Sequence, residues 1–369
     1  MKLRFLFALL FQGGICFAQS SFYPDRKAIE KNYDGAFVEL SNMLNGGAPL
    51  SFKRAVFITE NAYSDNRFRY DDFCTSISGL KKLCNAITKS RKLTYKYNDS
   101  LKIGRQASIF VLMTEDSLKM MLDSSRFVYH VPYKYDFDDI WGDSLWSNMF
   151  VSKLLTTHKG NCHSLPMLYK ILAQELGEDA YLSFAPNHIY IKTRCQKDGW
   201  YNTELTSGQF PVDAWLMASG YIHLSAIQNA IYMDTLSNRQ SIAVCLFDLA
   251  KGYERKIGIG SEPFILKCCD AALKEYPNYI NVLILKAETE KKIFEGLMKR
   301  YNATYPKDIF SIPQGKAIFE DMQGLYTKIH QLGYRSMPKE MYLEWLVTLK
   351  TEKEKYQNKN ITTFISPTK

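Results

Sequence analysis

The sequence predicts a mixed α+β fold in which one helix packs on an antiparallel sheet and further helical regions flank this centre. Leucines recur at helical spacing between residues 165 and 176, and Gly177 is a typical helix stop. Residues 188–193 alternate between apolar and polar side chains, as a half-buried strand does. A turn at 197–199 then leads back into a second extended run, which predicts an antiparallel pair.

The elements of this centre follow one another closely. The alternation of apolar and polar residues and the turn signals predict a short helix, the main helix and three strands, over residues 150–155, 162–176, 180–185, 188–193 and 200–206.

The region before the centre is predicted to be helical from about residue 21 to 125. Apolar residues at helical spacing and stop signals such as Gly46-Gly47 place helices at 28–43, 51–62, 71–83 and 105–113. None of them carries a chemical motif, so we interpret the region as a support. The aromatic stretch 126–150, with an extended run at 127–131, reads as the lead-in to the centre.

The region after residue 238 is predicted to be helical again. Helices are expected at 242–253, 263–276, 279–294, 314–331 and 339–356. The first of them resemble imperfect tetratricopeptide repeats. The polar tail after Asn358 is expected to be mobile.

The N-terminus reads as a secretory signal peptide. A basic start is followed by a short apolar core and by Ala18, after which we expect cleavage; Cys16 leaves lipidation open. The predicted division is a signal peptide at 1–18, a helical region at 19–125, a core at 126–237 and a helical tetratricopeptide-like region at 238–369. The protein is therefore expected to be periplasmic, outer-membrane-associated or secreted.

Composition narrows the classes of partner. The formal net charge is +9 without any dense Lys/Arg run, so nucleic acid is not an expected partner. No later segment approaches about 18 uninterrupted apolar residues, so no integral membrane segment is expected. Seven cysteines follow Cys16, and an odd count suggests at least one free thiol, although Cys74 and Cys84 are close enough in sequence for pairing to stay open.

The segment Gly160-Asn161-Cys162-His163 carries the candidate nucleophile. A cysteine at a helix N-terminus gains from the unpaired backbone N–H groups and the helix dipole, which lower a thiol pKa. Gly160 lets the chain approach closely and turn into the helix. The backbone N–H of Cys162 or His163 is a candidate donor to an oxyanion. A buried structural cysteine is the alternative.

His188 is the candidate base. It follows Pro186-Asn187 and opens a strand, so rigid backbone holds its ring, and a neutral imidazole takes a thiol proton and returns it to a leaving group. A purely structural histidine is the alternative. His163 points elsewhere on the helix and His158 lies in the preceding loop, so both are weaker candidates.

The residue that orients the histidine is expected on the next strand. Glu204 and Asn202 share one face of that strand, because alternate residues do. We favour Glu204, keep Asn202 as the alternative third member, and rank Asp213 after both.

These segments together resemble the transglutaminase-like superfamily of papain-type thiol enzymes. The resemblance covers residues 148–206 and rests on Gly160-Asn161-Cys162-His163-Ser164-Leu165, Leu168-Tyr169, Leu176-Gly177, Pro186-Asn187-His188 and Trp200-x-Asn202-x-Glu204-x-Thr206. It implies a papain/transglutaminase-like core of the bacterial branch that is joined to tetratricopeptide-like helices. It also implies Cys162 as nucleophile, His188 as base and Glu204 as third member, with His163 and Asn148 in supporting or oxyanion-holding roles. The family usually has Asp where this chain has Glu204, which leaves that assignment open.

Two hypotheses follow from the sequence. In the first, an exported thiol enzyme performs acyl transfer or hydrolysis of a peptide or isopeptide, on a peptide, protein or cell-wall substrate and without a cofactor. In the second, the core is catalytically silent and binds a peptide or protein together with its helical repeats. A zinc site is not expected. His158, Cys162, His163, His188 and Cys195 include possible ligands, but no Cys-x-x-Cys or His-Glu-x-x-His pair occurs.

Overall fold

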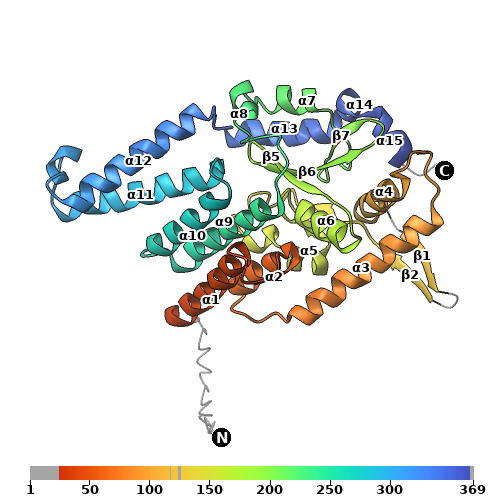
Figure 1. Ribbon diagram of the computed structural model, residues 1–369, viewed down its shortest axis with the longest axis horizontal. Helices are drawn as coiled ribbons and strands as arrows, with labels where there is room; N and C mark the ends of the chain where they lie inside the picture. The colour runs from red at the N-terminus through yellow and green to blue at the C-terminus, as the bar shows by residue number, and fades with distance from the viewer. Residues whose placement is uncertain (1–24, 117, 124–125, 366–369) are drawn as a thin grey trace, which may run out of the picture.

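The computed structural model describes residues 25–116, 118–123 and 126–365. The predicted signal peptide at 1–18 and Cys16 lie outside the described residues. The described chain is a mixed α and β structure that is mostly helical, with small sheets near its middle (Figure 1). None of the helices in this part of the chain combines the length and apolarity needed to cross a bilayer.

Four helices precede the centre: α1 (Arg26–Leu44), α2 (Phe52–Tyr63), α3 (Tyr70–Ser90) and α4 (Ser100–Thr114). They agree with the predicted ones, and their starts have local causes. The side chain of Ser51, for example, accepts a hydrogen bond from the backbone N–H of Arg54 at 3.2 Å and caps α2. Helices α3 and α4 pack against α6 of the centre, whereas α1 and α2 pack against α9 from the C-terminal region.

The prediction of an all-helical stretch up to residue 125 is wrong at its end. Strand β1 (Leu118–Asp123) pairs antiparallel with β2 (Arg126–His130), and the two form a hairpin at one end of the molecule (Figure 1). The leucine and methionines of β1 favour a helix. Pairing with β2, whose extended conformation the sequence predicted, overrides that weak preference.

The centre contains one main helix and a three-stranded sheet. The short elements η1 (Trp146–Met149) and α5 (Val151–Thr157) lead into α6 (Ser164–Glu175). A two-residue parallel pair joins β3 (Lys134–Tyr135) to β4 (Lys159–Gly160) just before α6. The sheet that α6 contacts has the order β5 (Tyr181–Ala185), β6 (His188–Cys195), β7 (Gly199–Thr203), and it is antiparallel throughout.

Helix α6 is buried on more sides than its leucine pattern suggests. Its residues from Ser164 to Ala173 are all buried, because α3, α4 and α5 cover the faces that the sheet leaves free. Its polar side chains therefore need internal partners. Lys170 Nζ donates to the carbonyl oxygen of Ala180 at 2.9 Å, and the hydroxyl of Tyr169 donates to Gln106 Oε1 at 2.8 Å.

The C-terminal half adds a series of helices. Two short ones, α7 (Asp213–Ser219) and α8 (Leu224–Gln228), follow the sheet. The longer ones are α9 (Asn238–Ile257), α10 (Glu262–Glu275), α11 (Ile280–Arg300), α12 (Pro313–Gln331) and α13 (Lys339–Thr351), with η2 (Pro306–Ile309) between α11 and α12. In Figure 1, α11 and α12 project from one end of the molecule, and α13 returns to lie beside the sheet near α7.

The last part of the chain differs from its prediction. The expected helix at 339–356 breaks at Glu352 into α13 and α14 (Lys353–Tyr356), and the tail that was predicted to be mobile forms α15 (Lys359–Ile365). Backbone bonds tie this segment to the centre: Asn358 N–H donates to the carbonyl oxygen of Phe210 at 2.7 Å. The fully buried side chain of Ile361 supplies the apolar anchor that the polar sequence obscured.

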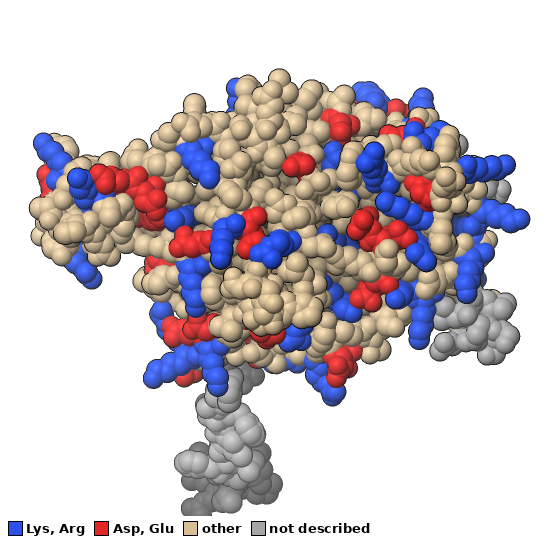
Figure 2. Space-filling model, in the orientation of Figure 1, with Lys and Arg blue, Asp and Glu red and all other residues tan. Residues whose placement is uncertain are grey.

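One hydrophobic core runs through all three predicted segments. A smaller apolar cluster around Phe294, Leu297 and Ile309 holds the tip of the projecting helices. On the face shown in Figure 2, basic and acidic side chains are interspersed without a field of one sign. No disulfide joins the seven cysteines of the described residues, which are all free.

A buried carboxylate holds the N-terminal region to the centre. Glu60 of α2 accepts hydrogen bonds from the backbone N–H groups of Val151 and Ser152, at 2.6 and 2.8 Å, and so caps α5 from another element. Burial raises the pKa of Glu60 to about 7, against the hydrogen bonds from Ser152 and Val151, which lower it.

We expect Glu60 to contribute a pH dependence to stability that Glu60→Gln removes. The pKa of Glu60 in the folded state lies above its value in the unfolded state. At pH values between these two pKa values the folded protein therefore binds more protons than the unfolded protein, and stability falls as pH rises through this range. Relative to the variant, the wild-type unfolding free energy should fall by about 1–2 kcal/mol between about pH 5 and pH 7.5. Urea unfolding of both proteins at each pH measures this difference. A difference that does not vary with pH contradicts the account.

Candidate functional site

Cys162 lies in the turn between β4 and α6, two residues before the helix begins. The side-chain oxygen of Asn161 accepts hydrogen bonds from the backbone N–H groups of His163 and Ser164, at 3.0 and 3.3 Å, and thereby caps α6. Among the described residues, the backbone N–H of Cys162 has no such partner. Of the two backbone donors that the sequence suggested for an oxyanion, only the one on Cys162 is available.

Gly160 is required by close packing. A Cβ atom at this position would collide with the side chains of Ser164 and, at 2.9 Å, Leu154. Ser164 in turn accepts from the backbone N–H of Asn161 at 3.1 Å and donates to the carbonyl oxygen of Asn148 at 3.0 Å. The approach of β4 to the first turn of α6 therefore fixes the direction in which the chain presents Cys162.

His188 is the first residue of β6, directly after the two-residue turn Pro186-Asn187. Asn187 adopts a left-handed conformation with φ of 57°, which asparagine tolerates better than most residues. Its carbonyl oxygen lies 3.8 Å from Cys162 Sγ, and its amide group donates to the carbonyl oxygen of Met337 at 3.1 Å. The turn therefore connects the end of the strand both to the cysteine and to the loop before α13.

Glu204 is paired with His188 inside the protein. His188 Nε2 lies 2.6 Å from Glu204 Oε2, and the two side chains are 0% and 1% exposed. The other carboxylate oxygen accepts from the backbone N–H of Thr206 at 2.7 Å, and the backbone of Glu204 pairs with Gln209. The carboxylate is thus held on both oxygens, which fixes the ring of His188.

A residue from α13 completes the arrangement. The hydroxyl of Tyr342 donates to Cys162 Sγ at 3.4 Å and lies 2.9 Å from His188 Nδ1. An unbroken series of contacts therefore runs from Cys162 through Tyr342 and His188 to Glu204. Tyr342 and His188 are 154 positions apart in sequence, and only the fold brings them together.

The pKa values of the pair move in opposite directions. Burial lowers the pKa of His188, but the negative charges of Glu204 and Cys162 raise it to about 10. Burial raises the pKa of the Cys162 thiol, but the positive charge and ring N–H of His188, the hydroxyl of Tyr342 and the charge of His163 bring it below its ordinary value. Compared with the free side chains, both shifts favour an imidazolium beside a thiolate over two neutral groups. His188 then donates through both ring nitrogens, and Tyr342 relays the Nδ1 hydrogen bond to the sulfur.

Aromatic rings enclose the site. Trp345 of α13 meets the ring of His188 edge-on at 4.8 Å, and Trp141 lies 4.9 Å from Tyr342. The buried hydroxyl of Tyr135 lies close enough to interact with Cys162 and Tyr342, and burial together with the charge of Cys162 holds the pKa of Tyr135 well above its usual range. Burial and the nearby Cys162 thiolate hold the pKa of Tyr342 well above its usual range, so that hydroxyl keeps its proton. Cys162 itself is half-buried.

Asn202, the alternative third member, lies on the same face of the sheet but makes other contacts. Its amide donates to Asp213 Oδ1 at 2.7 Å and to the carbonyl oxygen of Pro211 at 2.9 Å. Lys192, which pairs with Asn202 across the strands, also reaches Asp213 Oδ1 at 3.3 Å. Asn202 and Asp213 thus belong to a polar group further along β6, away from His188.

His163 and Asn148, the predicted supporting residues, do not contact Cys162 Sγ by hydrogen bond in the described structure. His163 Nε2 lies 3.0 Å from Asp248 of α9, and Nδ1 lies 2.9 Å from the carbonyl oxygen of Met149. Burial lowers the pKa of His163, but Asp248 and the carbonyl of Met149 raise it to about 9. The amide of Asn148 is held by Asp139 and Lys153. His163 therefore acts on Cys162 through its charge, and Asn148 supports the loop beneath Ser164.

The possible zinc ligands do not gather. His158 Nδ1 lies 3.0 Å from the carbonyl oxygen of Val131 and its ring stacks on Tyr133, whereas buried Cys195 accepts from the backbone N–H of Asp198. In the described ranges, no three His, Cys, Asp or Glu side chains come together in a way that would hold a metal ion.

Sequence reasoning missed Tyr342, Trp345 and Asp248. The only signal for the first two was the helical spacing of Tyr342, Trp345, Leu346 and Leu349, which shows a buried face but not what it covers. Comparisons with protein-family models, curated proteins and solved structures found no match.

We expect Cys162 to be alkylated at lower pH than an ordinary thiol. The thiolate fraction, and not solvent access, sets how the rate varies with pH. Iodoacetamide alkylation rates are measured from about pH 5 to pH 9 and resolved by peptide mapping. The rate at Cys162 should reach its plateau at a lower pH than that of an ordinary thiol. His188→Gln should shift the midpoint of this profile to higher pH by at least about 1 unit. Cys74, which is also half-buried, is the internal control. Identical profiles for the two cysteines, or no effect of the variant, contradict the pairing.

Two substitutions test whether Glu204 or Asn202 is the residue that orients His188. Glu204→Gln removes the charge that raises the pKa of His188 from its usual value, so this pKa should fall by more than about 1 unit. Asn202→Ala should leave it within a few tenths of a unit. Ring-nitrogen NMR of His188 in folded samples measures both. A larger effect of the Asn202 variant would exchange the two assignments.

Proposed function

We propose that this protein is an exported transglutaminase-like thiol enzyme that performs acyl transfer or amide hydrolysis. Cys162 is the nucleophile, His188 the proton carrier and Glu204 the acid that orients and charges His188. The observation that carries the proposal is the continuous contact from Cys162 Sγ through Tyr342 and His188 to a buried carboxylate, in which the pKa of the thiol is lowered and that of the imidazole raised.

The reaction begins from the ion pair. The thiolate adds to the carbonyl carbon of the amide, and the electron pair of the carbonyl moves to oxygen, where the free backbone N–H of Cys162 is the available donor. Collapse of this intermediate breaks the C–N bond, and the leaving amine takes the hydroxyl proton of Tyr342, which His188 replaces from Nδ1. Neutral His188 then takes a proton, through the same hydroxyl, from water or from an acceptor amine as it adds to the thioester carbon. Breakage of the C–S bond releases the thiolate and restores the ion pair.

The substrate class follows from this chemistry and from the resemblance. A thiol that attacks amides without a cofactor suits a peptide or an isopeptide link, in a peptide, in protein or in cell-wall material. Export by the signal peptide at 1–18 would direct the enzyme to the periplasm, the outer membrane or the outside of the cell. Neither nucleic acid nor a bilayer is needed by this reaction.

The surrounding architecture fits the proposed family in its order of elements. A helix packed on an antiparallel sheet forms the proposed papain-like core at 126–237, and the consecutive packing of α9 on α10, α10 on α11 and α11 on α12 suits a tetratricopeptide-like array at 238–369. The region 19–125 is the proposed support, since α1 and α2 lie against α9.

A second candidate function has one specific observation in its favour. Helix α13 covers Cys162 and His188 with the side chains of Tyr342 and Trp345, which are only 1% and 5% exposed. The sulfur of Cys162 already accepts a hydrogen bond from Tyr342. A catalytically inactive domain that binds a peptide or protein on another surface would be consistent with a covered site at Cys162. Binding of a partner by full-length Cys162→Ala, together with the absence of an acyl adduct in wild type, would favour this reading.

The enzyme should form a thioester on Cys162 that mass spectrometry can trap. Incubation with glutaminyl and isopeptide-linked peptides, followed by acid quenching, should add the acyl mass to the peptide that contains Cys162. Cys162→Ala should lose both the adduct and the turnover, since the methyl side chain of alanine cannot attack a carbonyl. Cys74→Ala, as a matched control, should keep both. Turnover by Cys162→Ala would refute the proposed mechanism.

Tyr342→Phe tests the relay while it keeps the aromatic ring. Loss of one hydrogen bond, worth about 1 kcal/mol net, should raise the pKa of Cys162 by about 0.5–1 unit, less than His188→Gln does. The pH profile of alkylation measures the shift, with the exposed Tyr301→Phe as control. An unchanged profile would mean that the hydroxyl does not support the thiolate.

A further inference from the structure

The hydroxyl of Tyr135 is a buried group near Cys162 to which the reaction described above gives no task. Tyr135 is the second residue of β3 and is only 8% exposed. Its hydroxyl lies close enough to interact with Cys162 and Tyr342, but its distances and angles to the described protein atoms do not amount to a full hydrogen bond. Such a group is costly inside a protein, and beside a nucleophile it has the chemistry to receive a substrate atom.

The backbone holds Tyr135 beside the segment that presents the nucleophile. Strands β3 and β4 pair in parallel, and Tyr135 lies opposite Gly160 in this pair. The N–H of Asp136, the residue after β3, donates to the carbonyl oxygen of Gly160 at 2.7 Å. Because Gly160 precedes Cys162 by only two residues, the same pairing restrains the Tyr135 side chain and the sulfur relative to each other.

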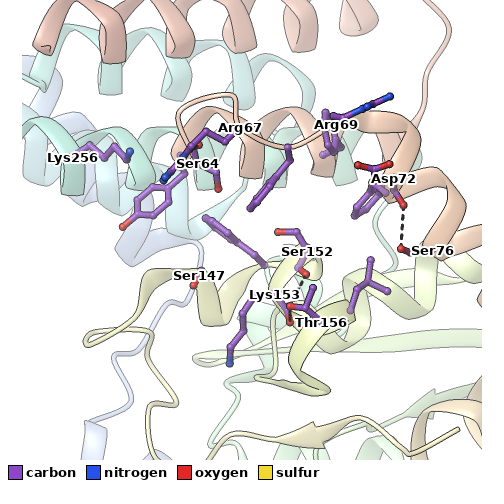
Figure 3. A pocket seen from close by; sticks show the side chains of 16 residues that line it. Ser64, Arg67, Arg69, Asp72, Ser76, Ser147, Ser152, Lys153, Thr156 and Lys256 are labelled. Carbon is purple, nitrogen blue, oxygen red and sulfur yellow. Dashed lines mark hydrogen bonds between the residues drawn. The ribbon is translucent and has the colours of Figure 1, made fainter. Parts of the chain in front are cut away.

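The side chain of Lys153 reinforces this pairing. Its amine donates to Asp136 Oδ2 at 3.4 Å and to the carbonyl oxygen of Lys159 at 3.1 Å, so it connects the end of β3 to β4. In Figure 3, Lys153 borders a cavity of about 760 Å³ between α5, the start of α3 and the loop before it, and its amine points away from that cavity. Tyr135 does not line the cavity, so its hydroxyl belongs to the surroundings of Cys162 alone.

The hydroxyl of Tyr135 keeps its proton. Burial and the negative charge of Cys162 hold the pKa of Tyr135 well above its usual range, so at neutral pH the group is a hydrogen-bond donor. Tyr342 has another task, because it donates to Cys162 Sγ at 3.4 Å, lies 2.9 Å from His188 Nδ1 and passes its proton to the leaving amine in the proposed reaction. Tyr135 is free of that relay and can donate a hydrogen bond without giving up a proton.

We propose that Tyr135 is a catalytic residue whose hydroxyl donates, together with the backbone N–H of Cys162, to the carbonyl oxygen of the substrate as negative charge develops there. The role rests on the proposed thiol chemistry of Cys162. In the tetrahedral intermediate the new bond joins Sγ to the carbonyl carbon, so the charged oxygen is only two bonds from the sulfur that Tyr135 approaches. No bond of Tyr135 is made or broken. Its hydrogen bond strengthens as the carbonyl electron pair moves to oxygen and weakens as that pair returns.

Tyr135→Phe keeps the ring and removes only the hydroxyl, and two reactions of Cys162 in the full chain reveal its effect. Acylation by p-nitrophenyl acetate develops an oxyanion, whereas alkylation by iodoacetamide does not. The variant should slow acylation at least about tenfold, since loss of one oxyanion donor costs about 10²–10³ in kcat. Its alkylation rate should stay within about twofold and its pH midpoint within a few tenths of a unit. Release of p-nitrophenolate and the mass of the Cys162 peptide measure the two reactions.

Tyr133→Phe is the matched control, because Tyr133 is a buried tyrosine of the same segment whose ring stacks on His158 instead. It should leave both rates unchanged. Normal alkylation of Cys162 also shows that Tyr135→Phe keeps a folded site. Unchanged acylation, equal slowing of both reactions, or a shifted alkylation midpoint in Tyr135→Phe would overturn the role of Tyr135 and leave Cys162 as the nucleophile. Absence of Cys162 acylation in wild type would instead overturn the proposed function, and the role of Tyr135 with it.

Discussion

The contact between Glu204 and His188 is the interaction on which the rest of the candidate site depends. Two ionised groups without exposure are unstable inside a protein unless each finds hydrogen-bond partners. Glu204 has the backbone of Thr206, and His188 has the hydroxyl of Tyr342. The carboxylate keeps the imidazole charged, and the charged imidazole lowers the pKa of Cys162. Each group would titrate elsewhere if the carboxylate were removed, so the site behaves as one electrostatic unit.

This unit is assembled from three parts of the chain. The turn before α6 supplies Cys162, the sheet supplies His188 and Glu204, and α13 supplies Tyr342 and Trp345. The single hydrophobic core explains how such distant segments keep a common geometry. Helices α1 and α2 pack on α9, and α9 contributes Asp248, which holds the charged His163 near Cys162. The flanking helices therefore take part in the electrostatics of the centre as well as in its support.

The sequence predicted most elements, and it predicted the members of the site that are close in sequence. The helix start near Cys162, the strand start at His188 and the strand before Glu204 are encoded locally, by Gly160, Asn187 and the alternation of residues. It favoured Glu204 without excluding Asn202, because both lie on one face, and the contacts of Glu204 with His188 and of Asn202 with Asp213 distinguish them. Tyr342 was beyond reach, since its role depends on tertiary packing. Strand β1 and helix α15 were missed because pairing and one buried isoleucine outweigh local composition.

The central claim is that the resting site contains a thiolate and an imidazolium. The most direct measurement is the ultraviolet thiolate absorbance of the wild type minus that of Cys162→Ala, followed as pH is raised. The account predicts a thiolate signal that is already present at neutral pH and is lost only in acid, because the charge of His188 stabilises the anion. A signal that first develops in the alkaline range of an ordinary thiol would show that His188 and Cys162 are neutral partners, and it would contradict the account.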